Sequence, residues 1–377
     1  MFEISQNKRV LFGSGSIAEV SNILTEISAK KVFILSYTQL LPASFLKALE
    51  HADTYICDIV QNEPDLAIID RLAAMLVEQK SDVILAIGGG SVLDAAKAAS
   101  MIATNGGTAE DYQMKGRVIT MPSLPLIMIP TTAGTGSEST KTSVLRNGRI
   151  KKSIHSPHMM AETVILDPDL TIGLSQSLTA STGIDALSHA VESYVSLNAN
   201  IYTRMYSLKA IEQIGKSIVT AVNDGKNLEA RAGMLYASFF AGCALHAGIG
   251  LAHIIAQPIG GMFNVPHGEA CSIFLPYSME FNLETCPAAY CDIGRALGIK
   301  NDGNDVKTAK LAIQKINEII SVVKTPTSLK SYVKETATDK FLNETVAIVM
   351  QATGHIKCNP RPVSDSDIKQ VLTMALS

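Results

Sequence analysis

The chain has 377 residues, which is more than one hydrophobic core usually supports, so we expect two domains. Apolar residues make up 47% of the composition and charged residues 18%, values that exclude an intrinsically disordered chain. The net charge of -3 gives no basic footprint for nucleic acid, and we expect no nucleic-acid partner.

The first half of the chain alternates short apolar runs with amphipathic stretches. Continuous apolar runs are typical of parallel strands covered on both faces, and they predict strands at residues 31–37 (KVFILSY), 53–60, 83–87 and 125–129. Helices are expected at residues 43–51, at 66–79 and from Val92 onward. Strands that alternate with helices predict a doubly wound α/β domain.

A glycine cluster follows the third of these strands, where residues 85–97 are LAIGGGSVLDAAK. Glycines allow a ligand to approach the backbone closely, and the start of the following helix offers unpaired N–H groups and partial positive charge. The segment predicts a pyrophosphate site, although its spacing is not that of the usual dinucleotide motif. A tight strand-to-helix turn without a ligand is the alternative.

A second turn rich in glycine and threonine, residues 130–138 (PTTAGTGSE), follows the next strand. By itself it is equally consistent with an ordinary loop. Two such loops at the carboxyl ends of strands in one sheet indicate a nucleotide in the crevice there. The early sequence FGSGS, residues 12–16, is a weaker signal and favours a turn.

The sequence pattern changes near residue 175. The rest of the chain lacks the alternation of apolar and polar residues that is typical of strands. We expect a nucleotide-binding α/β domain at residues 1–175 and an all-helical domain at residues 176–377. Residues 237–261 are apolar enough to span a bilayer, but His246, His253 and Gln257 interrupt them. We expect a buried helix there and no membrane partner.

Four side chains in the second half form a candidate metal site. Asp185 and His189 are four residues apart, so a helix places them on one face a turn apart. His253 lies on an apolar helix, and His267 follows Pro266 in an expected loop. Imidazole and carboxylate together suit Fe(II) or Zn(II). A single helical histidine is more often a packed core residue, but an unpaired buried aspartate among three histidines favours the metal.

These motifs together resemble the iron-containing (group III) alcohol dehydrogenase family. GGGSVLDAAK, PTTAGTGSE, ILDP at 165–168, TGIDALSHAVESYVS, GLAHIIAQPIGGMFNVPHG and NPRP at 359–362 occur in the order of that family and span nearly the whole chain. The resemblance implies a dehydroquinate synthase-like architecture and a metal-dependent enzyme that transfers hydride between a nicotinamide cofactor, NAD or NADP, and a small alcohol or aldehyde.

The resemblance also implies roles for particular residues. Fe2+, or Zn2+ in its place, is held by Asp185, His189, His253 and His267, which polarise the substrate oxygen through it. The expected cofactor-binding residues are Gly88, Gly89, Gly90, Ser91, Asp94, Thr131, Thr132, Thr135, Lys151 (with Lys152 as the alternative) and Tyr37.

Two positions depart from the family pattern. Gln257 stands where a second histidine commonly follows the first by one helical turn; it can hydrogen-bond but does not titrate near neutral pH, so we expect altered proton handling. Tyr37 stands at the end of a strand where NAD-preferring members often carry an acid, which leaves the choice between NAD and NADP open.

Several expectations concern the protein as a whole. The alternative functions are a glycerol dehydrogenase- or dehydroquinate synthase-like metal enzyme, or a non-catalytic nucleotide-binding relative. The six cysteines form no CxxC pair, and the first ten residues, MFEISQNKRV, lack the pattern of a signal peptide, so we expect a cytoplasmic protein with reduced thiols. The resemblance suggests a homodimer or higher homo-oligomer, with residues 2–11 adding strands across subunits.

Overall fold

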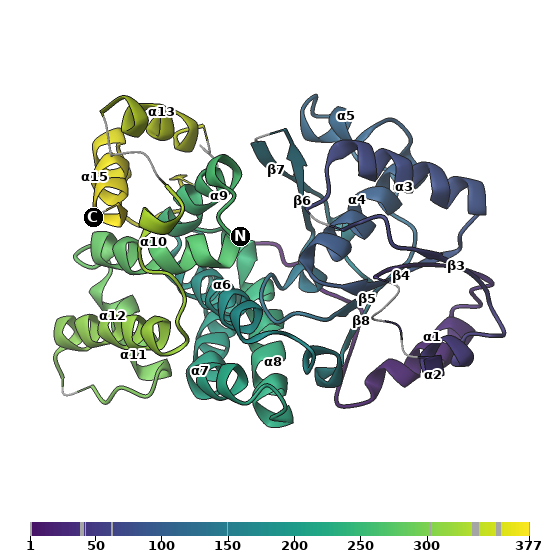
Figure 1. Cartoon of the computed structure of the whole chain (residues 1–377), viewed down its shortest axis with the longest axis horizontal. Helices are drawn as coiled ribbons and strands as arrows, with labels where there is room; N and C mark the ends of the chain where they lie inside the picture. Colours follow the sequence, from purple (N-terminus) through teal and green to yellow (C-terminus); the bar gives the residue numbers. More distant parts are fainter. Residues whose placement is uncertain are drawn as a thin grey trace. The chain divides into compact units, whose positions relative to one another are not determined.

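The computed structural model describes residues 2–37, 41, 43–61, 63–148, 150–301, 303–333, 339–351 and 356–376. The chain divides into two compact units (Figure 1). The first unit contains residues 3–132 and 136–172, and the second contains residues 133–135 and 173–377 together with Phe2.

The first unit is built on a six-stranded sheet in which every pairing is parallel. Its strand order is β1-β8-β5-β4-β2-β3. The strands are β1 (Arg9–Phe12), β2 (Lys31–Ser36), β3 (Asp53–Cys57), β4 (Val83–Gly88), β5 (Leu126–Pro130) and β8 (Thr163–Leu166). All residues of β4 and β5 are buried, as the apolar runs predict for strands covered on both faces.

Helices cover both faces of this sheet. In Figure 1, α1 (Val20–Glu26) and α2 (Ala43–Ala48) lie on one side of the strands, and α3 (Leu66–Gln79), α4 (Gly90–Asn105) and α5 (Ala109–Gln113) lie on the other. Ile23 and Phe45 from the first pair of helices pack with Ile34 and Leu85 of the sheet in one hydrophobic core. This arrangement confirms the doubly wound α/β layer.

The strand order has a switch point beside β2. The chain proceeds from β2 to its neighbour β3 on one side and then returns to β4 on the other side. Ligands of open α/β sheets bind outside the carboxyl ends of the strands at such a point. Ser36, the last residue of β2, is in register with Ile87 of β4, and Gly88 is in register with Pro130 of β5. The glycine cluster and the threonine-containing turn therefore leave the sheet from adjacent strands.

Two parts of the first unit differ from the sequence-based expectation. The predicted strand at 53–60 ends at Cys57. An antiparallel hairpin of β6 (Thr142–Asn147) and β7 (Ile150–His155) was not expected. Strand β1 forms an edge of the sheet by pairing with β8 of the same chain, and the pairing of residues 2–11 across subunits stays a prediction.

The regular secondary structure of the second unit is entirely helical among its described residues, as expected from its sequence pattern. Its helices are α6 (Gln176–Val195), α7 (Ile201–Asn223), α8 (Leu228–Ala244), α9 (Leu251–Phe263), α10 (His267–Asn282), α11 (Pro287–Ala296), α12 (Asp305–Val322), α13 (Asp339–Val349) and α15 (Asp365–Ala375). The buried residues of α6 include nearly all of its length after Leu178, so α6 lies in the core of this unit.

The apolar segment 237–261 is not one helix, which corrects the expectation. A 3₁₀ turn at Leu245–Ala247 follows α8, and Gly248 then adopts a φ of 84°, a conformation that glycine reaches without strain. The chain restarts as α9, bent by 105° from the preceding helix. Within the described residues, no single helix has the length and apolarity to cross a membrane, and only this bent pair passes on those criteria together.

Candidate active site

Four side chains of the second unit bring their ligand atoms within 4.8 Å of one another: Asp185, His189, His253 and His267. Three helices supply them. Asp185 and His189 come from one face of α6, His253 from the first turn of α9, and His267 is the first residue of α10. His267 was expected in a loop, and it instead begins a helix whose N-cap is Pro266.

The separations within this cluster suit a shared ion. Nε2 of His253 and Nε2 of His267 each lie 3.5 Å from Oδ1 of Asp185, and Nε2 of His189 lies 3.8 Å away. These distances are too long for hydrogen bonds. Two donors that each lie about 2.1 Å from one ion at a tetrahedral angle are about 3.4 Å apart. The cluster therefore has the spacing of a first coordination shell.

Because these side chains are buried, the cluster would destabilise the fold if no ion were bound. Asp185 is 3% exposed and His253 is 1% exposed. Nε2 of His253, the nitrogen nearest Asp185, is buried and has no hydrogen-bond partner among the described residues. An unsatisfied buried polar atom costs about 1–3 kcal/mol. A divalent cation would satisfy such a nitrogen and balance the Asp185 carboxylate, so these residues fit a metal. The His267 side chain is 28% exposed and marks the open side of the cluster.

The electrostatics of two of the four candidate ligands, Asp185 and His189, favour metal-binding protonation states. Burial alone raises the pKa of Asp185, but the imidazoles of His189, His267 and His253 together bring it below its ordinary value. Burial lowers the pKa of His189 to about 4, against the opposing effect of the Asp185 carboxylate. An ionised carboxylate and a neutral imidazole are the forms that bind a metal.

Small residues let the helices that carry the ligands approach closely. A Cβ on Gly268 would lie 2.1 Å from the carbonyl oxygen of Ser181 on α6. A Cβ on Gly134 would lie 2.7 Å from the Cβ of Thr182. The ring of His189 stacks on that of His253 with centroids 4.4 Å apart.

Sequence reasoning missed Glu192, which contacts a candidate ligand directly. Its Oε2 atom accepts a 2.5 Å hydrogen bond from Nδ1 of His253, and its Oε1 atom accepts one from the backbone N–H of Ala252. Glu192 follows Asp185 by seven residues on the same helix. The i, i+4, i+7 spacing of Asp185, His189 and Glu192 was a signal that the three share one helix face.

Sequence reasoning also missed Cys271, one turn after His267 on α10. Its Sγ atom lies 3.6 Å from Oδ1 of Asp185 and 3.8 Å from Nε2 of His267. Burial raises the pKa of the Cys271 thiol to about 11, so the neutral thiol donates to the Asp185 carboxylate. The six cysteines all lie in the described part of the chain, and none of them forms a disulfide.

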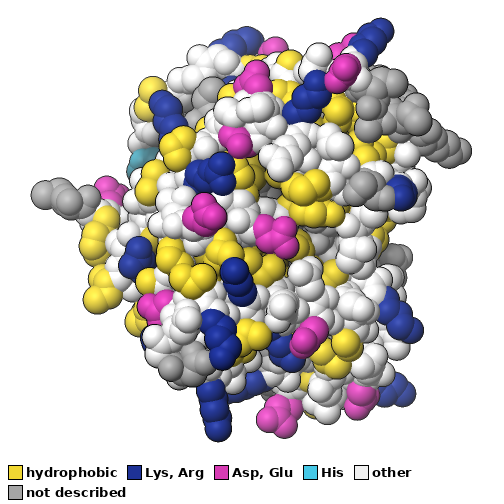
Figure 2. Space-filling model, turned by 90° about the vertical axis from the view of Figure 1, so that its left-hand side faces the viewer, with side chains coloured by type: hydrophobic (Ala, Val, Ile, Leu, Met, Phe, Trp, Pro, Cys, Tyr) yellow, Lys and Arg dark blue, Asp and Glu magenta, His cyan; other side chains and the backbone are white. Residues whose placement is uncertain are grey.

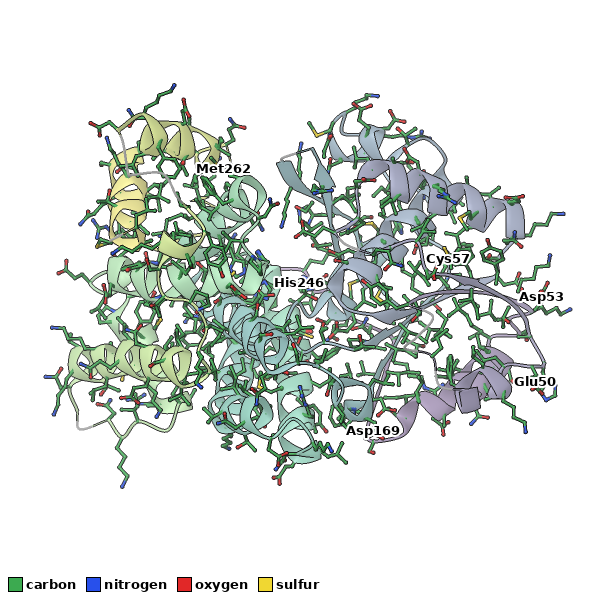
Figure 3. All side chains as sticks on the ribbon, in the orientation of Figure 1. Glu50, Asp53, Cys57, Asp169, His246 and Met262 are labelled. Carbon is green, nitrogen blue, oxygen red and sulfur yellow. The ribbon has the colours of Figure 1, made fainter. Side chains whose placement is uncertain are left out.

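Two further polar residues, Gln257 and His246, lie on α9 and in the turn before it. Gln257 is half-buried and lies one turn after His253 on the same helix. Figure 3 labels His246, which lies in the turn between α8 and α9, and Met262, near the end of α9. His246 is not among the four clustered side chains.

In the first unit, the glycine cluster opens a helix that has no side-chain cap. β4 ends at Gly88, Gly89 is the N-cap, and α4 begins at Gly90. A Cβ on Gly89 would lie 3.3 Å from Cγ2 of Thr132, so the second loop packs on the first. Backbone N–H groups at such a helix start are suited to an anion. Ser91 lies in the first turn, while Thr131 donates its backbone N–H to the carbonyl of Gly88.

The other expected cofactor residues have protein partners. Asp94 accepts hydrogen bonds from the Ser137 hydroxyl and the Val144 N–H, and it forms an ion pair with Lys97. Lys97 is completely buried and also donates to the carbonyl of Ser137. Asp94 thus connects α4 to the second turn, through Ser137, and to β6, through Val144.

The remaining expected residues are spread more widely. Lys151 lies on β7 and forms an ion pair with Glu63. Tyr37 directly follows β2, and partial burial raises the pKa of its phenol. Thr135 belongs to the second unit, together with Ala133 and Gly134.

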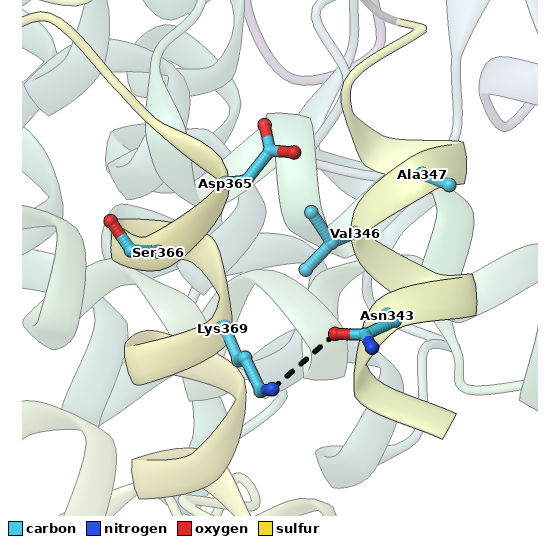
Figure 4. Close-up of a pocket in the computed structure, with 6 residues that line it drawn as sticks. All are labelled: Asn343, Val346, Ala347, Asp365, Ser366 and Lys369. Atoms are coloured by element: carbon cyan, nitrogen blue, oxygen red, sulfur yellow. Dashed lines mark hydrogen bonds between the residues drawn. The ribbon is translucent and has the colours of Figure 1, made fainter. Parts of the chain in front are cut away.

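A separate pocket in the second unit does not involve these residues. It has a volume of about 210 Å³ and lies between α13 and α15 (Figure 4). Lys369 crosses it to contact Asn343 at 3.3 Å and Asp339 at 2.7 Å. Figure 2 shows the adjoining face of this unit, where basic and acidic side chains are interspersed among the described residues.

Comparisons with known proteins agree with the fold and show the family. A family model for iron-containing alcohol dehydrogenases matches residues 7–168, and a model for the C-terminal part of the Fe-containing alcohol dehydrogenase family matches residues 179–376. The chain is 31% identical to long-chain-alcohol dehydrogenase 1 of Geobacillus thermodenitrificans, over 97% of this chain and 94% of that one.

Solved structures show the same architecture. A 1,3-propanediol oxidoreductase superposes with a TM-score of 0.93 at 31% identity, with 100% of both chains covered. A sulfoacetaldehyde reductase from Bifidobacterium kashiwanohense, solved in complex with NAD+, superposes with a TM-score of 0.91 at 26% identity, covering 100% of this chain and 99% of that one. The resemblance seen in the motifs is thereby confirmed: the chain belongs to the iron-containing alcohol dehydrogenase family and is an oxidoreductase of the alcohol dehydrogenase type.

Proposed function

We propose that this protein interconverts a small alcohol and its aldehyde with NAD or NADP, using a divalent metal ion, Fe2+ or Zn2+, held by Asp185, His189, His253 and His267. The observation that carries the proposal is the spacing of 3.5–3.8 Å between the three imidazole Nε2 atoms and Oδ1 of Asp185. That spacing fits donors around one ion and does not fit hydrogen bonds between the side chains.

Each of these residues has a distinct role in the proposed reaction. When bound, the metal ion polarises the substrate oxygen, and the nicotinamide accepts or supplies the hydride. Asp185 supplies the negative charge of the site from a position that is 3% exposed. His189, with a pKa of about 4, stays neutral at physiological pH and keeps a lone pair for the ion. His267, the more exposed imidazole, lies where a substrate can reach the site.

We infer that the cofactor pyrophosphate binds the start of α4, at Gly88 to Ser91, with Thr131, Thr132 and Thr135 nearer the nicotinamide. The uncapped helix start and the switch point of the sheet support this placement. The NAD+ complex of the sulfoacetaldehyde reductase supports NAD as the cofactor class. Tyr37, at the end of β2, provides neither a carboxylate for the ribose nor a cation for a 2′-phosphate.

A glycerol dehydrogenase-like or dehydroquinate synthase-like reaction is the alternative that shares this scaffold. Net oxidation of NADH or NADPH by a simple aldehyde separates a reductase from a synthase. A non-catalytic nucleotide-binding role would leave every aldehyde unreduced. The likeness of the whole chain to alcohol dehydrogenases, over 97% of its length in one relative, favours the reductase.

The test is a panel of aldehydes and alcohols assayed with NADH, NADPH, NAD+ and NADP+ on protein reconstituted with iron or with zinc. We expect one metal and one cofactor to support reduction of a simple aldehyde. In the same assay the Asp185→Ala variant should lose both its metal and its turnover. An Asp185→Ala protein that lost the metal and kept full turnover would refute the proposed role of the cluster.

The family resemblance also leads us to propose a homo-oligomer, at least a dimer, located in the cytoplasm. We place the added strands at edge strand β1, because among the described residues only one of its edges is paired, with β8. Sedimentation velocity of the metal-loaded protein measures this state directly.

A further inference from the structure

The first turn of α9, which carries His253, is capped by residues from distant parts of the chain. Its own N-cap, Gly250, provides no side chain. The backbone N–H of Leu251 donates to Oδ1 of Asn359, and that of Ala252 donates to Oε1 of Glu192 at 2.6 Å. A helix start leaves its first N–H groups without helical partners, so these two side chains satisfy donors that would otherwise be buried and unpaired.

The two carboxylate oxygens of Glu192 accept hydrogen bonds from different donors. Oε1 accepts from the backbone of Ala252, whereas Oε2 accepts from Nδ1 of His253 at 2.5 Å and more weakly from its backbone N–H at 3.4 Å. Glu192 is 3% exposed and His253 is 1% exposed, so water does not compete for these bonds. One carboxylate therefore fixes both the start of the helix and the ring at its first turn.

The chemistry of this contact determines which ring nitrogen is available to an ion. An ionised carboxylate can only accept hydrogen bonds, so Nδ1 of His253 must carry the proton. Nε2 then has a free lone pair, and it is this atom that is buried without a hydrogen-bond partner 3.5 Å from Oδ1 of Asp185. A carboxylate behind a ligating histidine sets its tautomer and orientation in many metal sites.

We propose that Glu192 is a positioning residue of the metal centre, which holds His253 with Nε2 directed at the ion and ties that geometry to the start of α9. The inference rests on the proposed metal-binding function. Gly250 supports it independently. A Cβ at Gly250 would lie 3.0 Å from Oε1 of Glu192 and 3.2 Å from Oδ1 of Asn359, so the absence of a side chain there lets both caps reach the helix.

The Glu192→Gln variant separates this role from simple packing. Glutamine has nearly the same shape as glutamate but only one oxygen, and its amide group is a donor. It can accept from the N–H of Ala252 or from Nδ1 of His253, but it directs an N–H group at the other. We expect the dissociation constant for Zn2+ to rise about 10- to 100-fold, the range typical of lost outer-shell partners.

The matched control is Asn359→Ala. It removes the cap on Leu251 and the hydrogen bonds between Asn359 and Asn282, but it does not touch the His253 ring. We expect Asn359→Ala to lower the midpoint of thermal unfolding while its Zn2+ dissociation constant stays within about threefold of wild type. Competition with a chromogenic chelator measures both variants. Equal losses of affinity in Glu192→Gln and Asn359→Ala would overturn the proposal, because helix placement alone would then account for them.

A second measurement keeps the proposal testable if Glu192→Gln does not fold. In zinc-loaded wild-type protein, nitrogen-15 NMR should show a slowly exchanging Nδ1–H proton on His253, identified by its loss in His253→Asn. A His253 ring protonated on Nε2, or an Nδ1–H that exchanges freely with water, would refute the assigned geometry. A wild-type protein that binds no Zn2+ at all would instead refute the metal-binding function, so the two failures are distinguishable.

Discussion

Gly268 packs against the backbone of Ser181 so closely that a Cβ at position 268 would lie 2.1 Å from the Ser181 carbonyl oxygen. This contact joins the start of α10, directly after the candidate ligand His267, to the helix that carries Asp185 and His189. Because the obstructing atom belongs to the backbone, rotation of a side chain cannot relieve the clash. The position of His267 relative to α6 therefore depends on the glycine.

We expect Gly268→Ala to lower the free energy of unfolding by about 3 kcal/mol, near the upper end for overpacking of a dense core. The variant should also bind Zn2+ more weakly, since His267 must shift with α10. Chemical unfolding and chelator competition measure the two effects. Gly173→Ala is the control, because a Cβ there meets nothing within 4 Å. A Gly268→Ala protein as stable as Gly173→Ala would contradict the packing argument.

The helix start at Gly89 offers a test of cofactor binding by two substitutions that differ in charge. Gly89 has extended backbone angles suited to an N-cap, and aspartate caps a helix better than glycine by a few tenths of a kcal/mol. The same carboxylate would repel a pyrophosphate. We expect Gly89→Asp to fold about as stably as Gly89→Asn and to bind NADH at least about tenfold more weakly, on the basis of one repulsive charge contact.

Gly89→Asn is its matched control, because asparagine caps equally well and carries no charge. Both side chains crowd Thr132, whose Cγ2 atom lies 3.3 Å from a Cβ at this position. The difference between the two variants thus isolates the charge. The chain contains no tryptophan, so the fluorescence of bound NADH can be followed without indole emission. Equal NADH affinities in the two variants would place the pyrophosphate elsewhere.

The buried carboxyl group of Glu138 leads us to expect that the free energy of unfolding falls as the pH rises. Its side chain is 1% exposed, its Oε1 atom has no hydrogen-bond partner, and burial raises its pKa from 4.5 to about 7 against the opposing charge of Lys97. Between these two values the folded protein retains a proton that the unfolded chain releases. The wild-type protein therefore loses stability as the pH rises through that window.

Glu138→Gln removes this loss. We expect no difference from wild type below pH 4.5 and a gain that reaches about 3 kcal/mol above pH 7, at 1.36 kcal/mol for each unit of pKa shift. Urea unfolding at a series of pH values measures the difference. Glu50→Gln, at an exposed position, should change stability by less than about 0.5 kcal/mol at every pH. A gain from Glu138→Gln that is the same at pH 4 and pH 8 would show that Glu138 does not titrate in this window.

The extent to which the sequence predicted the fold follows from how local each signal is. Strands β4 and β5 are continuous apolar runs, and α3 has a regular amphipathic period, so their positions were predicted within a residue or two. The hairpin of β6 and β7 was missed, since β6 contains Arg146 and β7 contains Lys151 and Lys152, which interrupt any apolar run. The break at Gly248 was missed because composition gives no sign of its left-handed φ.

In the candidate site, too, the sequence predicted local relationships and missed those between distant segments. Asp185 and His189 are a turn apart on one helix, so their pairing could be predicted from spacing alone. Grouping them with His253 and His267 rested on residue chemistry and on the family resemblance, because these histidines lie on other helices. The contact of Glu192 with the start of α9 spans 60 residues of sequence and depends on how α6 packs against α9, which no local pattern specifies. The contacts of Asp94 to Ser137, Val144 and Lys97 likewise join segments distant in sequence, and its expected role in cofactor binding stays a prediction.

Gln257 allows a test of proton handling beside the candidate metal centre. It lies one helical turn after His253, and its amide does not titrate, whereas a histidine there would change charge near pH 6.5. We expect Gln257→His to add an inflection between about pH 6 and 7 to the profile of kcat/KM, one that wild type lacks. Gln257→Met, which is similar in length and cannot titrate, should add none, so a new inflection in both variants would indicate a general disturbance of α9. If Gln257→His adds no inflection while still turning over substrate, position 257 takes no part in proton transfer, and the departure from the family pattern has no consequence for the pH dependence of the reaction.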